Sequence, residues 1–134
     1  MIIAEPTEPS ALLCAHSHVD KLLGIICTHA LEGRMSAVAA PWRELRDTLL
    51  SHLVEEEATI LPRFSLADPA DAAKIVRDHA RIRRQLAEVD EELSRGVMRR
   101  AKILSVVSFF RMHHYHEEAG MYRWARRHPV ETVS

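Results

Sequence analysis

Apolar residues recur along this chain at alternating steps of three and four positions, the period of a helix that buries one face. Four stretches show the pattern, at about residues 10–32, 37–61, 69–93 and 97–128. The alternation of apolar and polar residues that is typical of strands does not accompany them. The pattern therefore predicts four amphipathic helices.

Turn residues mark the ends of these stretches. Gly33 and Gly96 follow the first and third stretches, and glycine commonly ends a helix. Asp68 is followed by a proline, a combination that favours a helix start. Pro62 is predicted to end the second helix, so that residues 62–68 form a connector.

Four helices with short connections predict an all-α fold, an antiparallel up-down-up-down four-helix bundle. With 134 residues, the chain has the length of one domain, so residues 1–134 are interpreted as a single unit.

Six polar residues occupy positions on the apolar stripes, where a core is expected. They are four histidines and two glutamates: His16, His52, His79, His113, Glu56 and Glu117. Burying titratable groups is costly unless each of them finds a partner.

An internal repeat indicates that these six residues meet. His52-x3-Glu56 recurs as His113-x3-Glu117, and each half of the chain carries one more histidine on its first helix. The histidines of the first half lie 17 residues before and 19 residues after Gly33, and those of the second half lie 17 residues on each side of Gly96. In two antiparallel hairpins, all four would lie at one level, about 25 Å from the turns.

Four imidazoles and two carboxylates that converge in a core predict a metal site. Mixed nitrogen and oxygen ligands suit iron, manganese or zinc better than calcium or magnesium. Six protein ligands are too many for one open zinc site, and they suit two metals bridged by carboxylates.

Two alternatives compete within this ligand set. His18 is a weaker candidate than His16 because it lies off the apolar stripe, and His114 with Glu118 is weaker than His113 with Glu117 because its stripe would bring Arg111 inward. Neighbouring residues that could orient the ligands or bound oxygen species are Glu57, Asp78, His114, Tyr115, Glu118 and Tyr122. An exposed helix face, or simple packing of the tyrosines, explains these neighbours equally well.

The four motifs together resemble the bacterial single-domain members of the hemerythrin-like family, the HHE cation-binding domains. The matching pieces are His16-x2-Val, His52-x3-Glu-Glu-x2-Ile-Leu-Pro, His79-x2-Ile and His113-x3-Glu-Glu, which cover roughly residues 10–125. The resemblance implies a four-helix bundle with an oxo- or hydroxo-bridged centre of two iron ions. It also implies that Glu56 and Glu117 bridge the irons.

The same resemblance implies that His16 and His52 cap one iron and that His79 and His113 cap the other. Oxygen carriers of the family have a further histidine where this chain has Ile75, and they use His-x4-Asp on the last helix. A more open iron favours reaction with peroxide, dioxygen or nitric oxide over reversible oxygen transport. The alternatives are a non-catalytic sensor, carrier or store of oxygen, nitric oxide or iron, and a bundle with a structural role that holds zinc or no metal.

The composition limits the possible binding partners and the cellular compartment of the protein. The net charge of −1 argues against a nucleic acid or an anionic membrane surface, and no stretch is long and apolar enough to span a membrane. Cys14 and Cys27 lie about 20 Å apart on one predicted helix, so they are interpreted as free thiols of a cytoplasmic protein. The expected partners are small molecules, and the expected state is a monomer or a small homo-oligomer.

Overall fold

A computed structural model describes residues 11–130, and within that range the chain forms helices and no strand. The helices are α1 (Leu12–Leu31), α2 (Ala39–Ala58), α3 (Ile60–Ala67), α4 (Pro69–Ser94), α5 (Arg100–Glu117) and α6 (Arg123–Arg127), with a 3-10 turn at Met35–Ala37 and a π-helical segment at Glu118–Tyr122. The predicted all-α class is confirmed. The predicted start of the first helix at residue 10 lies outside the described residues.

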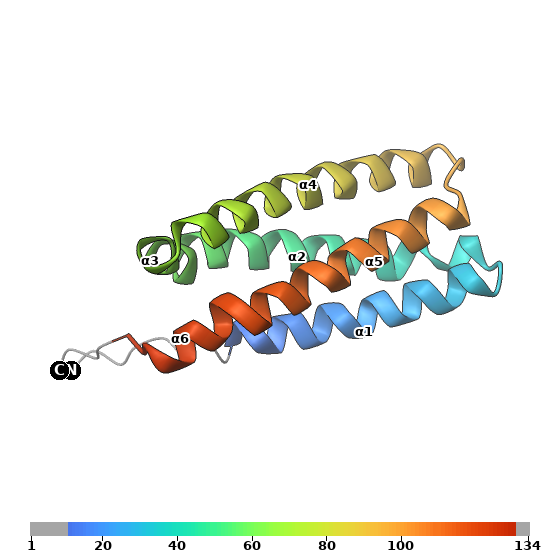
Figure 1. Cartoon of the computed structure of the whole chain (residues 1–134). Helices are drawn as coiled ribbons and strands as arrows, with labels where there is room; N and C mark the ends of the chain where they lie inside the picture. The colour runs from blue at the N-terminus through green and yellow to red at the C-terminus, as the bar shows by residue number, and fades with distance from the viewer. Residues whose placement is uncertain (1–10, 131–134) are drawn as a thin grey trace.

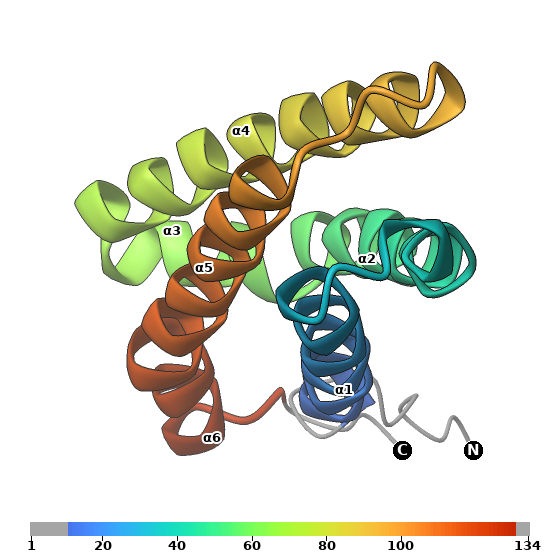
Figure 2. The same cartoon turned by 90° about the vertical axis from the view of Figure 1, so that its right-hand side faces the viewer.

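Each of the four long helices packs mainly against two of the others. Helix α1 packs against α2 and α5, and α4 packs against the same two helices. The α1–α2 and α4–α5 connections lie at one end of the molecule, and α3 lies at the other end (Figure 1). When the molecule is turned by 90°, the helices are seen to cross one another and not to run parallel, and α4 lies over α2 (Figure 2).

Glycines close both turns at the shared end. Gly33 has φ 76° and Gly96 has φ 68°, in the left-handed region that a side chain disfavours. After each glycine the next amide donates back into the helix, from Arg34 to the carbonyl of His29 and from Val97 to that of Glu92. These bonds satisfy carbonyls that a helix end leaves without partners.

The interpretation of residues 62–68 as a connector was wrong. Helix α2 ends at Ala58, and Pro62 lies in the first turn of α3, where a missing N–H costs no helical hydrogen bond. In a continuous helix, the ring of Pro62 would clash with the carbonyl of Ala58. The chain therefore breaks at Thr59, whose ψ is −77°, and restarts at once.

Helix α4 begins where the sequence indicates. The side chain of Asp68 accepts a hydrogen bond from the amide of Asp71, with Pro69 as the first helical residue. The last predicted helix, 97–128, is shorter at its start, since α5 begins at Arg100, and it is interrupted by the π-helical segment.

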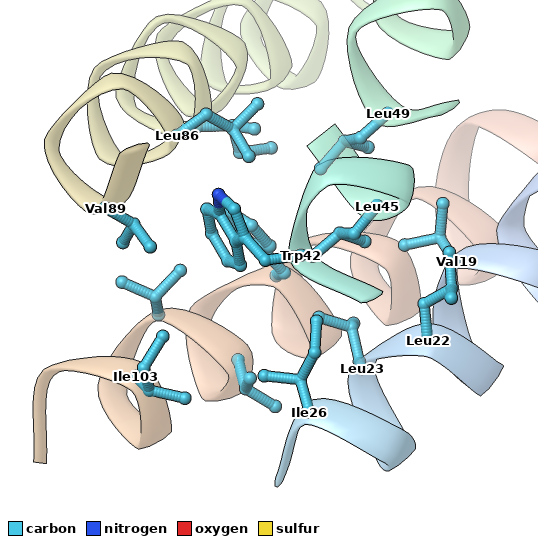
Figure 3. Packing of buried hydrophobic residues seen from close by; sticks show 14 of the residues in the cluster. Val19, Leu22, Leu23, Ile26, Trp42, Leu45, Leu49, Leu86, Val89 and Ile103 are labelled. Atoms are coloured by element: carbon cyan, nitrogen blue, oxygen red, sulfur yellow. The ribbon is translucent and has the colours of Figure 1, made fainter. Parts of the chain in front are cut away.

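Two apolar clusters fill the interior, and a polar layer separates them. The larger cluster surrounds Trp42, whose ring lies among Leu86, Val89 and Ile103, and whose indole nitrogen donates to Asp90 at 2.9 Å (Figure 3). The smaller cluster packs near α3 and the π-helical segment, and it consists of Leu12, Ile60, Leu61, Phe64, Ala72, Ile75, Met121, Tyr122 and Ala125.

Each long helix carries buried polar residues between these two clusters. On α1, for example, His16 lies between Leu12 of the smaller cluster and Val19 of the larger one. The same order holds on α4, where His79 follows Ile75 and precedes Ile82. The apolar clusters thus enclose the polar layer on both sides. Among residues 11–130, no helix combines the length and apolar character needed to cross a membrane.

Candidate metal centre

The six residues singled out from the stripes meet in this layer. All are at most 2% exposed: His16, His52, Glu56, His79, His113 and Glu117. The alternative ligand His18 lies at the surface beside Glu44, with its side chain half exposed. The structure thus places His16, and not His18, beside the two glutamates.

The six residues form two groups that share both glutamates. One group joins the glutamates to His16 and His52, and the other joins them to His79 and His113. In each group, one nitrogen or oxygen atom from every residue lies within 4.8 Å of the others. Each group could hold one metal ion. This division into histidine pairs is the one that the family resemblance implies.

Glu56 presents one oxygen to each group. Its Oε2 lies 3.3 Å from Nε2 of His16 and 3.0 Å from Nε2 of His52. Its Oε1 lies 3.0 Å from Nε2 of His79. The carboxylate therefore spans the two groups, as a bridging ligand does.

Glu117 spans the groups in the same way from the opposite hairpin. Its Oε1 lies 3.2 Å from Nε2 of His16. Its Oε2 lies 3.0 Å from Nε2 of His79 and 2.8 Å from Nε2 of His113. All four histidines thus direct Nε2 at the carboxylates.

Several of these buried atoms make no hydrogen bond, although they lie close together. The orphaned atoms in the two groups are Nε2 of His16, Nε2 of His113, Oε1 of Glu56 and Oε1 of Glu117. A buried polar atom without a partner costs about 1–3 kcal/mol. A metal ion in each group would satisfy these atoms, so the residues present fit two metal ions.

The ionisable groups of the layer shift one another's pKa values. Burial lowers the pKa of His16, but the close carboxylates of Glu117 and Glu56 outweigh it and raise that pKa to about 10. The same balance raises the pKa of His79 to about 10. For Glu117, burial and the charge of Glu56 raise the pKa, yet contacts with His113, His16 and His79 lower it to about 2. A metal ion must therefore displace protons from imidazolium groups.

Carboxylates hold the other ring nitrogen of three histidines. Nδ1 of His16 donates to Glu118 at 3.1 Å. Nδ1 of His79 donates to Glu57 at 2.7 Å, and Nδ1 of His113 donates to Asp78 at 3.2 Å. Because a carboxylate accepts only, Nδ1 carries a proton in each of these three rings, so a metal would bind at Nε2 and displace any proton there.

His114 is buried, which rules out an exposed helix face for it. It is 2% exposed and stacks on His16, with ring centroids 4.1 Å apart and planes at 14°. Its Nδ1 lies 3.4 Å from Asp20. Burial is the largest cause that lowers the pKa of His114. Arg111 nevertheless remains exposed, because α5 buries a wide face that contacts both α1 and α4.

The two candidate tyrosines separate clearly. Tyr115 is 76% exposed and lies outside the buried layer, although it lines surface pockets beside His113 and His114, so a role at the site stays a prediction. Tyr122 is buried, and its hydroxyl donates to Oε2 of Glu56 and lies 3.4 Å from Nε2 of His52. Burial and the charges of Glu56 and Glu117 raise the pKa of Tyr122, which keeps its proton in place at neutral pH.

Sequence reasoning missed two cations that hold the outer carboxylates. Arg83 contacts both carboxylate oxygens of Glu57 at 2.8 Å. Lys74 donates to Asp78 at 2.8 Å. The Lys74–Asp78 pair has the four-residue spacing of a helical ion pair, so the sequence contained that signal. The Arg83–Glu57 pair joins two helices and has no such signal.

Surface pockets reach the outer residues of the layer from two sides of α5. A pocket of about 510 Å3 is lined by Asp78 and His113, together with Phe109 and Met112. A second pocket of about 350 Å3 is lined by His114 and Glu118. Small molecules can therefore approach the layer closely.

No family model, curated protein or solved structure matches this chain. The functional interpretation accordingly rests on the residues of the layer and their geometry. Cys14 and Cys27 are free thiols, as the helix spacing predicts.

Proposed function

We propose that this chain is an antiparallel four-helix bundle of the hemerythrin-like type that binds two iron ions and reacts with hydrogen peroxide or dioxygen. One observation carries the proposal. Glu56 and Glu117 each direct one oxygen toward each pair of histidines. Carboxylates shared in this way suit two metal ions bridged by the same ligands. Two independent metal sites would not need them.

The histidines would hold the ends of the metal pair. His16 and His52 would bind one iron through Nε2, and His79 and His113 would bind the other. Outer carboxylates fix the tautomer of three of these rings, which is the usual arrangement around a metal-bound histidine. When bound, the iron pair would supply the electrons for reduction of peroxide or for binding of dioxygen.

Tyr122 is the residue best placed to act on a bound small molecule. Its hydroxyl lies beside Glu56 and His52, next to one metal position. The position where oxygen carriers of the family have another histidine is Ile75, which here belongs to the apolar cluster around Tyr122. We infer that Tyr122 donates a hydrogen bond or proton from Oη to a small molecule bound at the metal position between His16 and His52.

Reaction with peroxide tests the proposal. Iron-loaded protein is expected to consume hydrogen peroxide and to change its visible absorption on mixing. Tyr122→Phe should keep both irons and consume peroxide about 100-fold more slowly, within the range for loss of a positioned proton donor. Tyr115→Phe is the matched control, and it should behave as wild type because Tyr115 is exposed.

Two outcomes would contradict this function. Iron-loaded protein that neither consumes peroxide nor changes its spectrum would exclude a peroxide reaction. Slow and stable binding of dioxygen or nitric oxide without turnover would instead support the sensor, carrier or store.

A further inference from the structure

The two histidines of one metal position are held by ion pairs, and both ion pairs involve α4. Nδ1 of His79 donates to Glu57 at 2.7 Å, and Arg83 holds both oxygens of that carboxylate at 2.8 Å. A bidentate arginine–carboxylate contact fixes the plane of the carboxylate as well as its position. Arg83, Glu57 and His79 thus form a chain of hydrogen bonds in which the imidazole ring of His79 can rotate little.

His113 ends a second series of this kind. Its Nδ1 donates to Asp78 at 3.2 Å, and Lys74 donates to the same carboxylate oxygen at 2.8 Å. The side chain of Asp78 is 14% exposed. Both ligands at this position are therefore oriented before any metal arrives.

The other metal position lacks such support. Nδ1 of His52 is buried and has no hydrogen-bond partner. Nδ1 of His16 donates to Glu118 at 3.1 Å, but the side chain of Glu118 is 43% exposed. Within residues 11–130, no lysine or arginine is paired with Glu118.

We propose that the two metal positions are unequal, and that the position between His79 and His113 fills first and binds tighter. The proposal rests on the metal-binding part of the proposed function. Partners that orient a ligating histidine change metal affinity about 10–100-fold, so the two dissociation constants are expected to differ at least 10-fold. The weaker position lies beside Tyr122, where the reactive small molecule would bind.

One effect opposes this order. Arg83 draws negative charge away from Glu57, and the hydrogen bond from His79 to this weakened carboxylate makes His79 a weaker base. The positive charge of Arg83 also repels a metal ion. The side chain of Arg83 is 38% exposed, so solvent screens this repulsion. Fixed orientation of the ligand is therefore expected to outweigh the repulsion.

Cobalt titration of the metal-free protein tests the proposal. Co2+ binding, followed by visible absorption and calorimetry, is expected in two steps. Arg83→Gln should weaken the tighter step about 10-fold and leave the weaker step unchanged. Glu118→Gln should do the reverse. Arg84→Gln, which removes an exposed charge from the same helix, is the matched control and should change neither step.

The outcomes separate this proposal from the proposed function. Two equal sites, weakening of the same step by both variants, or tighter binding after Arg83→Gln would overturn the inequality. Circular dichroism of each metal-free variant shows whether it is folded. Two unequal sites without any reaction toward peroxide would contradict the function and leave the inequality intact. No cobalt binding by the wild type would overturn both.

Discussion

Excess ferrous iron, added to the metal-free protein without oxygen, is expected to raise its free energy of unfolding by about 8 kcal/mol. Each site contributes about 4 kcal/mol when free iron exceeds its dissociation constant about 1,000-fold. The effect is large because the metal-free layer buries orphaned atoms of His16, His113, Glu56 and Glu117 between two apolar clusters. Urea unfolding with and without iron measures the difference.

The control for this experiment is Glu117→Ala, which removes one shared carboxylate. Its unfolding free energy should rise much less with iron than that of the wild type. A rise of less than about 1 kcal/mol for the wild type would contradict a metal pair in the core. The dependence of stability on urea concentration should stay the same, since the folded and unfolded states expose similar surface with and without iron.

A graded loss of metal is expected across three alanine variants. Glu56→Ala should reduce the metal content from two to less than one ion per chain, because Glu56 contacts histidines of both groups. His79→Ala should lose at least one ion. His18→Ala should keep both, since His18 lies at the surface against Glu44. Elemental analysis after dialysis measures the metal content.

Circular dichroism must show that each variant is folded before its metal content is compared. The ligand set would be wrong on α1 if His18→Ala lost metal and His16→Ala did not. Equal metal content in Glu56→Ala and the wild type would contradict the bridging role of Glu56.

The positions of the buried polar residues could be predicted because helical periodicity and the repeat act together. The step of four from His52 to Glu56, and again from His113 to Glu117, keeps both members on one face of a helix. The glycines that close the turns, Gly33 and Gly96, fix the depth of that face in each hairpin. The four-residue spacing and the turn glycines are local features, so they can be recognised in the sequence.

The features that could not be predicted from the sequence depend on tertiary packing. The sequence left open whether His114 lies beside the site or on an exposed helix face, and the structure buries it because α5 contacts both α1 and α4 and buries two adjacent histidines. The break at Thr59 follows from a clash between Pro62 and Ala58, which a helix can relieve in more than one way. Neither result follows from one segment alone.

The π-helical segment explains why Tyr122 reaches the layer. In a regular α-helix, position 122 would lie about 140° around the axis from Glu117. The wider π turn at Glu118–Tyr122 rotates the chain less for each residue and brings Tyr122 to the same side. Periodicity with a fixed helical step cannot predict such a change.

Metal analysis of the protein purified from iron-replete cells tests the central claim most directly. The account predicts a coloured protein with about two irons per chain and little zinc. A colourless protein with zinc or without metal in the layer of His16, His52, Glu56, His79, His113 and Glu117 would contradict it.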